Sequence, residues 1–481
     1  MPVESLHPDY VAFQGQRQKV QDVFNGTDTL RARGEQYLPR NPHEAYSDYN
    51  TRLDRSFLTN YVRQTVKTFA SRPFTEKLRI ENDDQFEDRM TDIDGEGTSL
   101  HNLAFDAFEA QIRDGLVFLM ADKPNVPGAV TEADMKGVKP YLTFFTADQV
   151  IGWKTDRVNS QERVTQVRIF QKILRDSSDD SFEVESVDMI RVLNLTTWEE
   201  WEFDKSSRKY ELVKNGDYDF KIDGVPRIPI VVAYCDKRGT FIADSPMEQI
   251  ADLNLAHWQS TSDLRHILHI AQVPILFSKN LGDDDGEMTI GPNSRASTTN
   301  PEGDLRWVEI EGTSIKAGQD NIDRITADMR MLSWELLVRP NKDRETATGR
   351  QIDHQESQTA IAAYAMNFVN ALNRILGYLA NWNRKEFKGS VVLNNDFEIA
   401  TDLGALTVLM EGFKEDAIPP LMFLTELQRY DVISDFWDVK KISKEVEELK
   451  KAEREAFGGA RAAENIAGVK SESTPGNEST E

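Results

Sequence analysis

The segment Ser245–Ala271, with the sequence SPMEQIADLNLAHWQSTSDLRHILHIA, decides how the rest of the chain is interpreted. It opens with a serine followed by a proline, which is the pattern of a helix N-cap with proline at the first helical position. We therefore predict a helix that runs from this cap to about Ala271.

The region after this helix predicts two more helices, separated by loops. Residues 273–312 are polar and rich in Gly, Asp and Asn, and we interpret them as a hairpin region. Apolar residues over 314–337 recur at spacings of three, four and once seven, which predicts a second helix. Pro340 ends it, and a third, long helix is expected over about 346–386. A strand is predicted over 391–399.

The C-terminal region is predicted to be helical and then disordered. Two or three short helices are expected within 404–456, with Pro419-Pro420 between the first two. Residues 458–481 are rich in Gly, Ala, Glu, Ser and Thr and contain no aromatic residue, a composition typical of disorder.

The chain before Ser245 divides into a helical region and a strand-rich region. Spaced apolar residues predict helices over Tyr10–Phe24 and Leu53–Phe69, and Ser99 is a candidate cap for a helix over Leu100–Asp114. Between 116 and 234, short β-branched or aromatic runs predict strands without regularly alternating helices, which indicates an α+β fold rather than a parallel doubly wound domain. The predicted strands are Val117–Met120, Tyr141–Phe145, Val164–Ile173, Phe182–Glu185, Met189–Leu195, Trp198–Phe203, Tyr210–Val213 and Arg227–Ala233.

The composition is that of an acidic chain without a membrane-spanning segment. Its 481 residues suggest roughly three domain-sized units, and 57 Lys and Arg against 81 Asp and Glu give a net charge of −24. We expect no tight binding of nucleic acid through the general surface, because that affinity comes from cations that neutralise phosphates. The single cysteine, Cys235, excludes an intrachain disulfide framework, and the N-terminus has no secretory signal pattern, so we expect assembly in the cytoplasm.

Motifs for catalysis are absent from the sequence. The chain has no nucleotide-binding loop and no H-E-x-x-H, G-x-S-x-G or G-x-G-x-x-G motif. His257, His266 and His269 share one predicted helix, but His257 lies about 180° from His266 around the helix axis, so one face cannot hold all three. We interpret these histidines as polar positions at a helix or subunit contact, and we expect no metal and no cofactor.

A short acidic run lies inside the predicted hairpin region. Asp283, Asp284, Asp285 and Glu287 superficially resemble a calcium loop. An EF-hand loop needs a glutamate at its twelfth position, and that position is Ser294 here. We therefore interpret the run as a solvated acidic hairpin tip.

A basic run follows the second predicted helix. Arg339, Lys342, Arg344 and Arg350 outnumber two acids, for a local charge of +2 in a chain of −24. Two interpretations stay open, a basic turn between helices and a loop that touches a polyanion.

The order of these elements resembles that of the portal proteins of tailed bacteriophages. The resemblance begins with the helix opening Ser245-Pro246-Met247-Glu248-Gln249-Ile250. It continues with Leu305-Arg306-Trp307-Val308-Glu309 at the end of the hairpin region and Glu345-Thr346-Ala347-Thr348-Gly349 before the long helix. His7-Pro8-Asp9-Tyr10 and Tyr37-Leu38-Pro39-Arg40 resemble an uncharacterised subgroup of that family. The resemblance covers about residues 7–455.

The resemblance implies a portal fold built from consecutive segments. The segments are a wing over 1–244, a first stem helix over 245–271, a clip over 272–313, a second stem helix over 314–337, a tunnel loop over 338–349, a long wing helix and strand over 350–401, a small crown over 402–457 and a disordered tail over 458–481.

The same resemblance implies a structural protein without enzymatic activity. Family members form a ring, usually dodecameric, at one capsid vertex of the virion, and this ring conducts double-stranded DNA during packaging and ejection. The implied partners are the terminase large subunit, a head–tail adaptor, the major capsid protein and DNA that is bound without sequence specificity. Arg339, Lys342, Arg344 and Arg350 would contact DNA, and the acidic hairpin would face the lumen or a docking partner.

An acidic ring suits a conduit physically, because it repels phosphates and keeps DNA from sticking as it advances.

Two alternatives stay open. One is a metal-dependent nuclease or hydrolase that uses carboxylates such as Asp283–Asp285 or Asp92 and Asp94. The other is a different structural component of the virion, such as a minor capsid or adaptor protein.

Overall fold

A computed structural model divides the chain into two compact units, Met1–Asn395 and Asp396–Glu481. The residues that it describes are 2–83, 85–86, 89–124, 139–158, 161–176, 184–271, 275–279, 301–302, 304–308, 312–337, 360–394, 403–414, 418–429, 439–446 and 448.

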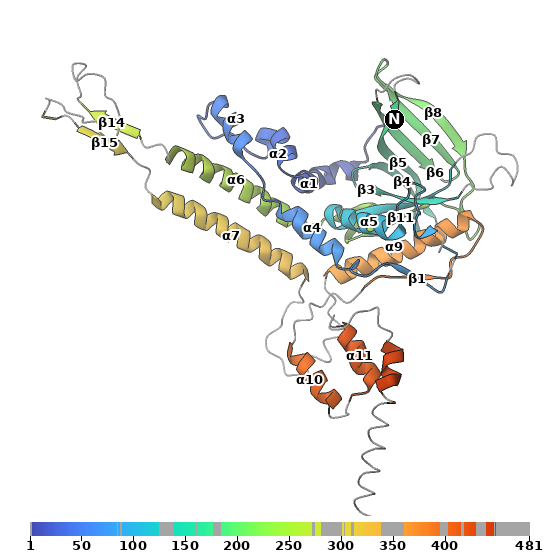
Figure 1. The fold of residues 1–481 in the computed structure, drawn as a ribbon. Coiled ribbons are helices and arrows are strands. Elements are labelled where there is room, and N and C mark those ends of the chain that lie inside the picture. The colour runs from blue at the N-terminus through green and yellow to red at the C-terminus, as the bar shows by residue number, and fades with distance from the viewer. Residues whose placement is uncertain are drawn as a thin grey trace, which may run out of the picture. The chain divides into compact units, whose positions relative to one another are not determined.

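The first unit begins with short helices (Figure 1). These are α1 (Pro8–Asn25), α2 (Thr27–Arg33), a 3-10 turn at Gly34–Gln36, α3 (Tyr46–Arg55) and α4 (Tyr61–Ser71). The helix predicted over Tyr10–Phe24 is confirmed as α1. His7 caps it, because its Nδ1 accepts a hydrogen bond from the Asp9 N–H at 3.2 Å, and its ring stacks on Trp153 at 3.9 Å.

The continuous helix predicted over Leu53–Phe69 is wrong, because α3 ends at Arg55 and α4 begins at Tyr61. Ser56 closes α3 by donating its hydroxyl to the Leu53 carbonyl at 2.6 Å. Asn60 opens α4 by accepting from the Arg63 N–H at 2.8 Å, as an N-cap does. The apolar spacing runs through this break, so the hydrophobic pattern alone does not reveal it.

The strand-rich region contains two main sheets, and every strand pairing in the described residues is antiparallel. The structure is therefore a mixed α+β fold, as the sequence predicts. The first sheet has the order β11 (Ile230–Tyr234), β2 (Leu116–Asp122), β3 (Tyr141–Thr146). The second has the order β4 (Val150–Val158), β5 (Gln161–Asp176), β6 (Val184–Asn194), β7 (Thr197–Asp204), β8 (Lys209–Asp217).

Three strand predictions need correction. The strands predicted over Phe182–Glu185 and Met189–Leu195 are a single strand, β6, over their described residues, because residues between them continue the pairing with β5. The strand predicted over Arg227–Ala233 begins only at Ile230. Strand β4 was not predicted, since Gly152 interrupts its pattern and the long β5 supplies its pairing partner.

The core of the first unit is built on β2, whose seven residues are all buried. One face of β2, with Leu116, Phe118 and Met120, packs with residues of the five-stranded sheet. Helices α5 (Leu100–Asp114) and α9 (Ala360–Trp382) also pack against β2. These contacts join the two main sheets to the helices that pack on them.

Helix α5 matches its prediction at both ends. Ser99 is its N-cap, with its side chain accepting from the Asn102 N–H at 3.2 Å. Gly115 ends it with a φ of +85°, and a Cβ there would lie 2.4 Å from the Asp244 carbonyl oxygen. Only glycine fits both this backbone angle and this close approach.

The remaining elements of the first unit are small strand pairs and two long helices. They are β1 (Arg79–Glu81) with β16 (Ser390–Val392), β9 (Lys221–Ile222) with β10 (Val225–Pro226), β12 (Asp236–Gly239) with β13 (Ile242–Asp244), α6 (Glu248–Ala271), β14 (Ile275–Lys279) with β15 (Asp304–Val308), and α7 (Gly312–Leu337). Of the strand predicted over 391–399, the structure has β16, which already ends at Val392, and residues 395–399 lie outside the described residues. Of the long helix predicted over 346–386, residues 346–359 lie outside the described residues and α9 ends at Trp382.

The second unit contains α10 (Leu403–Lys414) and α11 (Pro420–Arg429). Phe413 and Phe423 stack between them, with ring centroids 4.1 Å apart. Pro420 is the first residue of α11, in agreement with the predicted proline boundary between two short helices. The predicted disordered tail, 458–481, lies outside the described residues.

Candidate functional site: the helix pair α6 and α7

Helices α6 and α7 lie side by side and run antiparallel (Figure 1). Asn321 Nδ2 donates to Ser260 Oγ at 3.5 Å, and a Cβ on Gly318 would lie 3.2 Å from Leu264 Cδ1. Their 24 and 26 residues give helices about 36 and 39 Å long at 1.5 Å per residue. The antiparallel strands β14 and β15 connect them at one end. The sequence interpretation of a helix, a hairpin region and a second helix is therefore confirmed in the described residues.

The first half of α6 is anchored by apolar packing. Ile250, Ala251 and Trp258 are at most 1% exposed, and Leu255 is 8% exposed. Helix α6 contacts α1 and α4 of the N-terminal region. The first half of this helix is thus fixed by burial of large side chains, which is the dominant stabilising term in folding.

Asn254 of α6 anchors this helix to α4, because its side chain caps the N-terminal end of α4. Its Oδ1 accepts from the N–H groups of Tyr61 and Val62 at 3.0 and 3.3 Å, and its Nδ2 donates to the Thr59 carbonyl at 2.9 Å. The side chain is completely buried. It satisfies backbone groups at a helix start that would otherwise lack partners.

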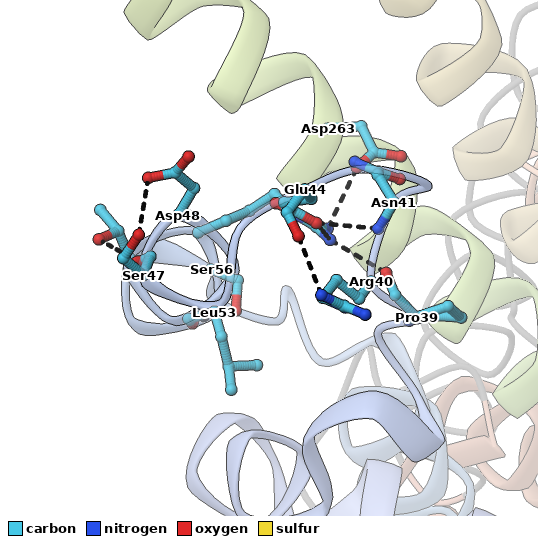
Figure 2. Close-up of polar contacts among 11 residues, drawn as sticks. Pro39, Arg40, Asn41, Glu44, Ser47, Asp48, Leu53, Ser56 and Asp263 are labelled. Atoms are coloured by element: carbon cyan, nitrogen blue, oxygen red, sulfur yellow. Dashed lines mark hydrogen bonds and ion pairs between the residues drawn. The ribbon is translucent and has the colours of Figure 1, made fainter.

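The second half of α6 is held by charged contacts to α3 (Figure 2). Arg52 is 4% exposed; its guanidinium donates to Glu44 through Nε at 2.8 Å and Nη2 at 2.9 Å. The same group donates to Asp263 of α6 at 3.2 Å and to the Pro39 carbonyl at 3.0 Å. One buried arginine therefore ties α3, the loop before it and α6 together.

The electrostatics of this cluster follow from its geometry. The hydrogen bonds between Arg52 and Glu44 raise the pKa of the guanidinium and lower the pKa of the carboxyl. Burial raises the pKa of Asp263, against the opposing effect of Arg52. The Arg52–Glu44 pair is consequently charged at neutral pH.

The two N-terminal motifs of the sequence make packing contacts, and the second of them contacts α6. The Tyr37 carbonyl accepts from Gln259 of α6 at 2.6 Å, and the Tyr37 hydroxyl donates to the buried Asp22 at 2.9 Å. Tyr10 in the other motif donates to the Asp148 carbonyl at 3.0 Å. Both motifs are thus used in packing.

The three histidines of α6 lie in two different environments, as the helical spacing predicts. His257 is buried against Tyr61 in an edge-on ring contact at 5.6 Å, and burial lowers its pKa. His266 and His269 line a small pocket between α3 and α6. Among the residues that the structure describes, no group of three or more His, Cys, Asp or Glu side chains is arranged to hold a metal ion.

The paired helices carry little net charge. Helix α6 has three acids and one arginine, and α7 has four acids and three basic residues. The exposed residues of α7 include both signs, with Lys316, Asp320, Asp323, Arg324 and Arg330 among them. Most of the chain's excess of carboxylates therefore lies outside these two helices.

The residues proposed from sequence for DNA contact and for docking lie outside the described residues. This applies to the acidic run Asp283, Asp284, Asp285 and Glu287 and to the basic run Arg339, Lys342, Arg344 and Arg350. Along the chain, the acidic run falls between β14 and β15, and the basic run follows the end of α7.

Two acids named in the nuclease alternative are used by the backbone. Asp92 accepts from the N–H groups of Gly95 and Gly97 at 2.8 and 3.0 Å, and Asp94 accepts from those of Glu96 and Thr98 at 2.9 and 3.0 Å. Both carboxylates thus hold a tight loop.

Cys235 is buried, and its thiol donates to the Gln111 carbonyl at 3.4 Å. Burial raises the pKa of this thiol.

Sequence reasoning missed Arg52, Glu44 and Asn254. Arg52 and Asp263 are 211 residues apart, and Asn254 caps a helix more than 190 residues before it. A local pattern carries no signal for such pairs.

Among the described helices, none is both long and apolar enough to cross a membrane.

Comparisons with known proteins give one partial family match and distant structural similarity. A family model described as "Domain of unknown function (DUF4055)" matches residues 246–383, which span α6 to α9. No match was found among curated proteins. Chains in two solved structures, described as "Neck of empty GTA particle computed with C6 symmetry" and "Neck of native GTA particle computed with C12 symmetry", are each 14% identical to this chain with a TM-score of 0.36. Each alignment covers 73% of this chain and 84% of the other chain.

Proposed function

We propose that this chain is a portal-type protein, which forms a closed ring at one vertex of a capsid and conducts double-stranded DNA. The proposal rests on one observation, the antiparallel pair α6 and α7 with β14 and β15 between them. This pair is followed along the chain by α9, which packs on the central sheet. This order of helix, strand pair, helix and long helix supports the assignment to stem helix, clip, stem helix and wing helix that the sequence resemblance implies.

The exposed faces of the helix pair favour contact with further copies. Helix α7 buries Ile322, Ile325 and Met329, while Met331 is 55% exposed. On α6, Ile267 is 36% exposed. A two-helix layer of this kind needs further cover to bury its second face. Identical chains supply that cover through a heterologous contact that closes into a ring.

The charge distribution supports a conduit that does not grip DNA. The paired helices are nearly neutral, and the chain as a whole carries −24. Repetition of this charge around a ring repels phosphates. We propose that Arg339, Lys342, Arg344 and Arg350 supply weak phosphate contacts that centre the duplex, because phosphate contacts position DNA without reading its sequence.

Two parts of the chain are proposed to bind other virion or packaging proteins. The segment between β14 and β15, with Asp283, Asp284, Asp285 and Glu287, is proposed to meet the terminase large subunit and later the head–tail adaptor. The wing is proposed to meet the major capsid protein. The proposed role is structural, without a catalytic step and without a cofactor.

Electron microscopy of the purified chain in negative stain, together with mass photometry, tests the proposal. We expect rings with a central channel and a mass that is a large integer multiple of 54.8 kDa, close to twelve. A compact dimer without a channel would contradict the ring and the conduit together.

A second experiment tests the loop assignment within the ring. Replacement of Arg339, Lys342 and Arg344 by alanine should leave the ring intact and reduce DNA packaging or retention. Replacement of Lys316, Arg324 and Arg330 by alanine removes the same charge from α7 and serves as the matched control for packaging in rings that still form. Normal packaging in the loop variant would contradict the assignment.

A further inference from the structure

A pocket of about 710 Å³ lies between residues of the two main sheets and the end of α9. Its lining comes from β2 and β3, from β6, β7 and β8, from the segment around β9, and from the last turn of α9. This volume falls within the range of about 300–1,000 Å³ that is typical of small-molecule sites. The pocket is therefore large enough to hold a small ligand.

Four lining side chains of alternating charge form a row across this pocket, which we call the charged row. Arg191 of β6 lies directly opposite Glu200 of β7, and Glu200 lies directly opposite Lys214 of β8, so the three side chains share one face of the sheet. Arg191 Nη1 also lies 2.7 Å from Asp122 Oδ2 of β2, and Lys214 Nζ lies 3.7 Å from Glu200 Oε2. Each charge thus has a neighbour of opposite sign, and the row has no net charge.

The charged row remains accessible to a ligand. The side chains of Asp122, Arg191 and Glu200 are 12%, 17% and 20% exposed. A simple ion would be attracted by one member of the row and repelled by the next. A hydroxyl group, in contrast, donates to a carboxylate and accepts from a guanidinium or an ammonium group. The row therefore suits a neutral ligand with several hydroxyl groups.

Aromatic rings form another part of the wall. The Trp382 ring lies 5.1 Å from Phe220 and 6.3 Å from Tyr218, measured between centroids. Trp382 Nε1 donates to the Ala121 carbonyl at 2.9 Å, which fixes the orientation of the indole. The faces of such rings carry negative partial charge and attract the C–H groups of a sugar ring.

Trp198 is positioned at the wall by a glycine on the neighbouring strand. Gly216 of β8 lies directly opposite Trp198, and a Cβ at Gly216 would lie 2.9 Å from Trp198 Nε1. The indole thus packs against the backbone of β8, and a larger residue there would displace it. A half-buried ring is held in place before a ligand arrives, which lowers the entropy that binding costs.

The other charged residues of the lining leave the pocket nearly neutral. They are Lys123, Asp217, Asp219, Lys221 and Arg384. Lys221 Nζ and Asp219 Oδ1 form an ion pair at 2.7 Å. Together with the charged row, the lining has five basic and four acidic residues, for a net charge of +1. A pocket of this composition does not strongly select an ion of either sign.

We propose that this pocket binds a neutral sugar or a similar cyclic polyol. Its hydroxyl groups bond to the charged row, and its C–H face packs on an aromatic ring of the wall. The proposal goes beyond the portal function, because neither the ring nor DNA conduction requires such a ligand.

Titration calorimetry of the full chain with glucose, N-acetylglucosamine and maltose tests the proposal. We expect saturable binding of at least one of these sugars. Glucose 6-phosphate adds negative charge to the same ring, and it should bind no more tightly than glucose, because the charged row attracts hydroxyl groups rather than net charge.

Three variants locate the binding site. Glu200→Gln should weaken sugar binding several-fold, because a charge-assisted hydrogen bond is lost. Trp198→Ala should weaken it about fivefold or more, because a stacking face is removed. Glu211→Gln removes the same charge as Glu200→Gln from an exposed position of β8 outside the pocket lining, and it should bind like the wild type. Glu200→Gln keeps the size of the side chain, so it tests the site even if Trp198→Ala does not fold.

Three results would overturn the proposal. The first is the absence of saturable binding of all three sugars by the wild-type chain. The second is binding that Glu200→Gln leaves unchanged or that Glu211→Gln weakens equally, since the sugar would then lie elsewhere. The third is tighter binding of glucose 6-phosphate than of glucose, which would show that the pocket selects charge.

Discussion

The two halves of α6 are built in different ways. The first half buries Ala251, Asn254 and Trp258 completely, in the helix that packs on α1 and α4. The second half meets α3 through the Arg52–Asp263 ion pair and encloses a small pocket with it, and it leaves Ile267 36% exposed. The first half is therefore fixed by the folding of the chain itself. The second half is tied to α3 by polar and charged contacts.

The largest difference between the halves should appear when large side chains are removed. Trp258→Ala should lower the free energy of unfolding by about 3–5 kcal/mol, because it leaves a cavity in a fully buried site. Ile267→Ala in the second half should cost less than about 1 kcal/mol. Chemical denaturation of both variants measures the difference. Equal losses would show that the second half is packed as tightly as the first.

The next largest change in the free energy of unfolding is expected from Asn254, whose side chain joins α6 to the start of α4. Asn254→Ala should lower the free energy of unfolding by about 2–3 kcal/mol, because two backbone N–H groups and one carbonyl lose their partner in a buried place. Gln249→Ala, at an exposed position of the same helix, is the matched control and should change little. A loss no larger than that of the control would rule out the long-range cap.

The charged half should show a pH dependence that comes from the Arg52–Glu44 pair. Arg52 lowers the pKa of Glu44 below its ordinary value of 4.5 in the folded chain. The pair therefore stabilises the fold above that value, and the stabilisation is lost as the pH falls through the folded-state pKa. At neutral pH, Glu44→Gln should cost about 1–2 kcal/mol, because Arg52 loses a charged partner.

The measurement is denaturation of the wild type and Glu44→Gln as a function of pH. The difference between them should shrink towards zero well below pH 4.5. Glu76→Gln, at the exposed ion pair with Arg79, is the control and should follow the wild type throughout. A difference that stays constant with pH would mean that the ion pair does not carry the effect.

The smallest expected change in the free energy of unfolding comes from Gly318, which lies where α7 packs against Leu264 of α6. Gly318→Ala should stabilise the chain by a few tenths of a kcal/mol, because the gain in helix propensity exceeds a contact that the flexible end of Leu264 can relieve. Gly377→Ala in α9 meets nothing within 4 Å and should gain about 0.5–1 kcal/mol. Destabilisation by Gly318→Ala alone would indicate tight packing at the far end.

The sequence was informative where a local pattern decides the structure. Ser99 and the apolar spacing after it predicted α5 from its first to its last residue. The Ser245-Pro246 opening predicted α6 within three residues of its start. Parts of β5, β6, β7 and β8 were predicted where β-branched and aromatic residues cluster, whereas β4 of the same sheet was missed. The antiparallel α+β class followed from the lack of alternating helices.

Long-range contacts limited the rest of the prediction. The break between α3 and α4 depends partly on Asn254, which lies more than 190 residues away. The Arg52 cluster draws on Glu44, Asp263 and the Pro39 carbonyl, and the distant partner has no sequence signature. The small pocket lined by His266 and His269 likewise brings together the end of α3 and one face of α6.

Hydrogen–deuterium exchange along α6 and α7 tests the contrast between the two halves most directly. Amides in 248–258 should exchange slowly in both the unassembled and the assembled chain. Amides in 262–271 of α6 and 312–321 of α7 should exchange faster in the unassembled chain and become protected when the ring forms. Equal protection of both halves before assembly, or no gain in the second half on assembly, would contradict the proposal that further copies complete this region of the molecule.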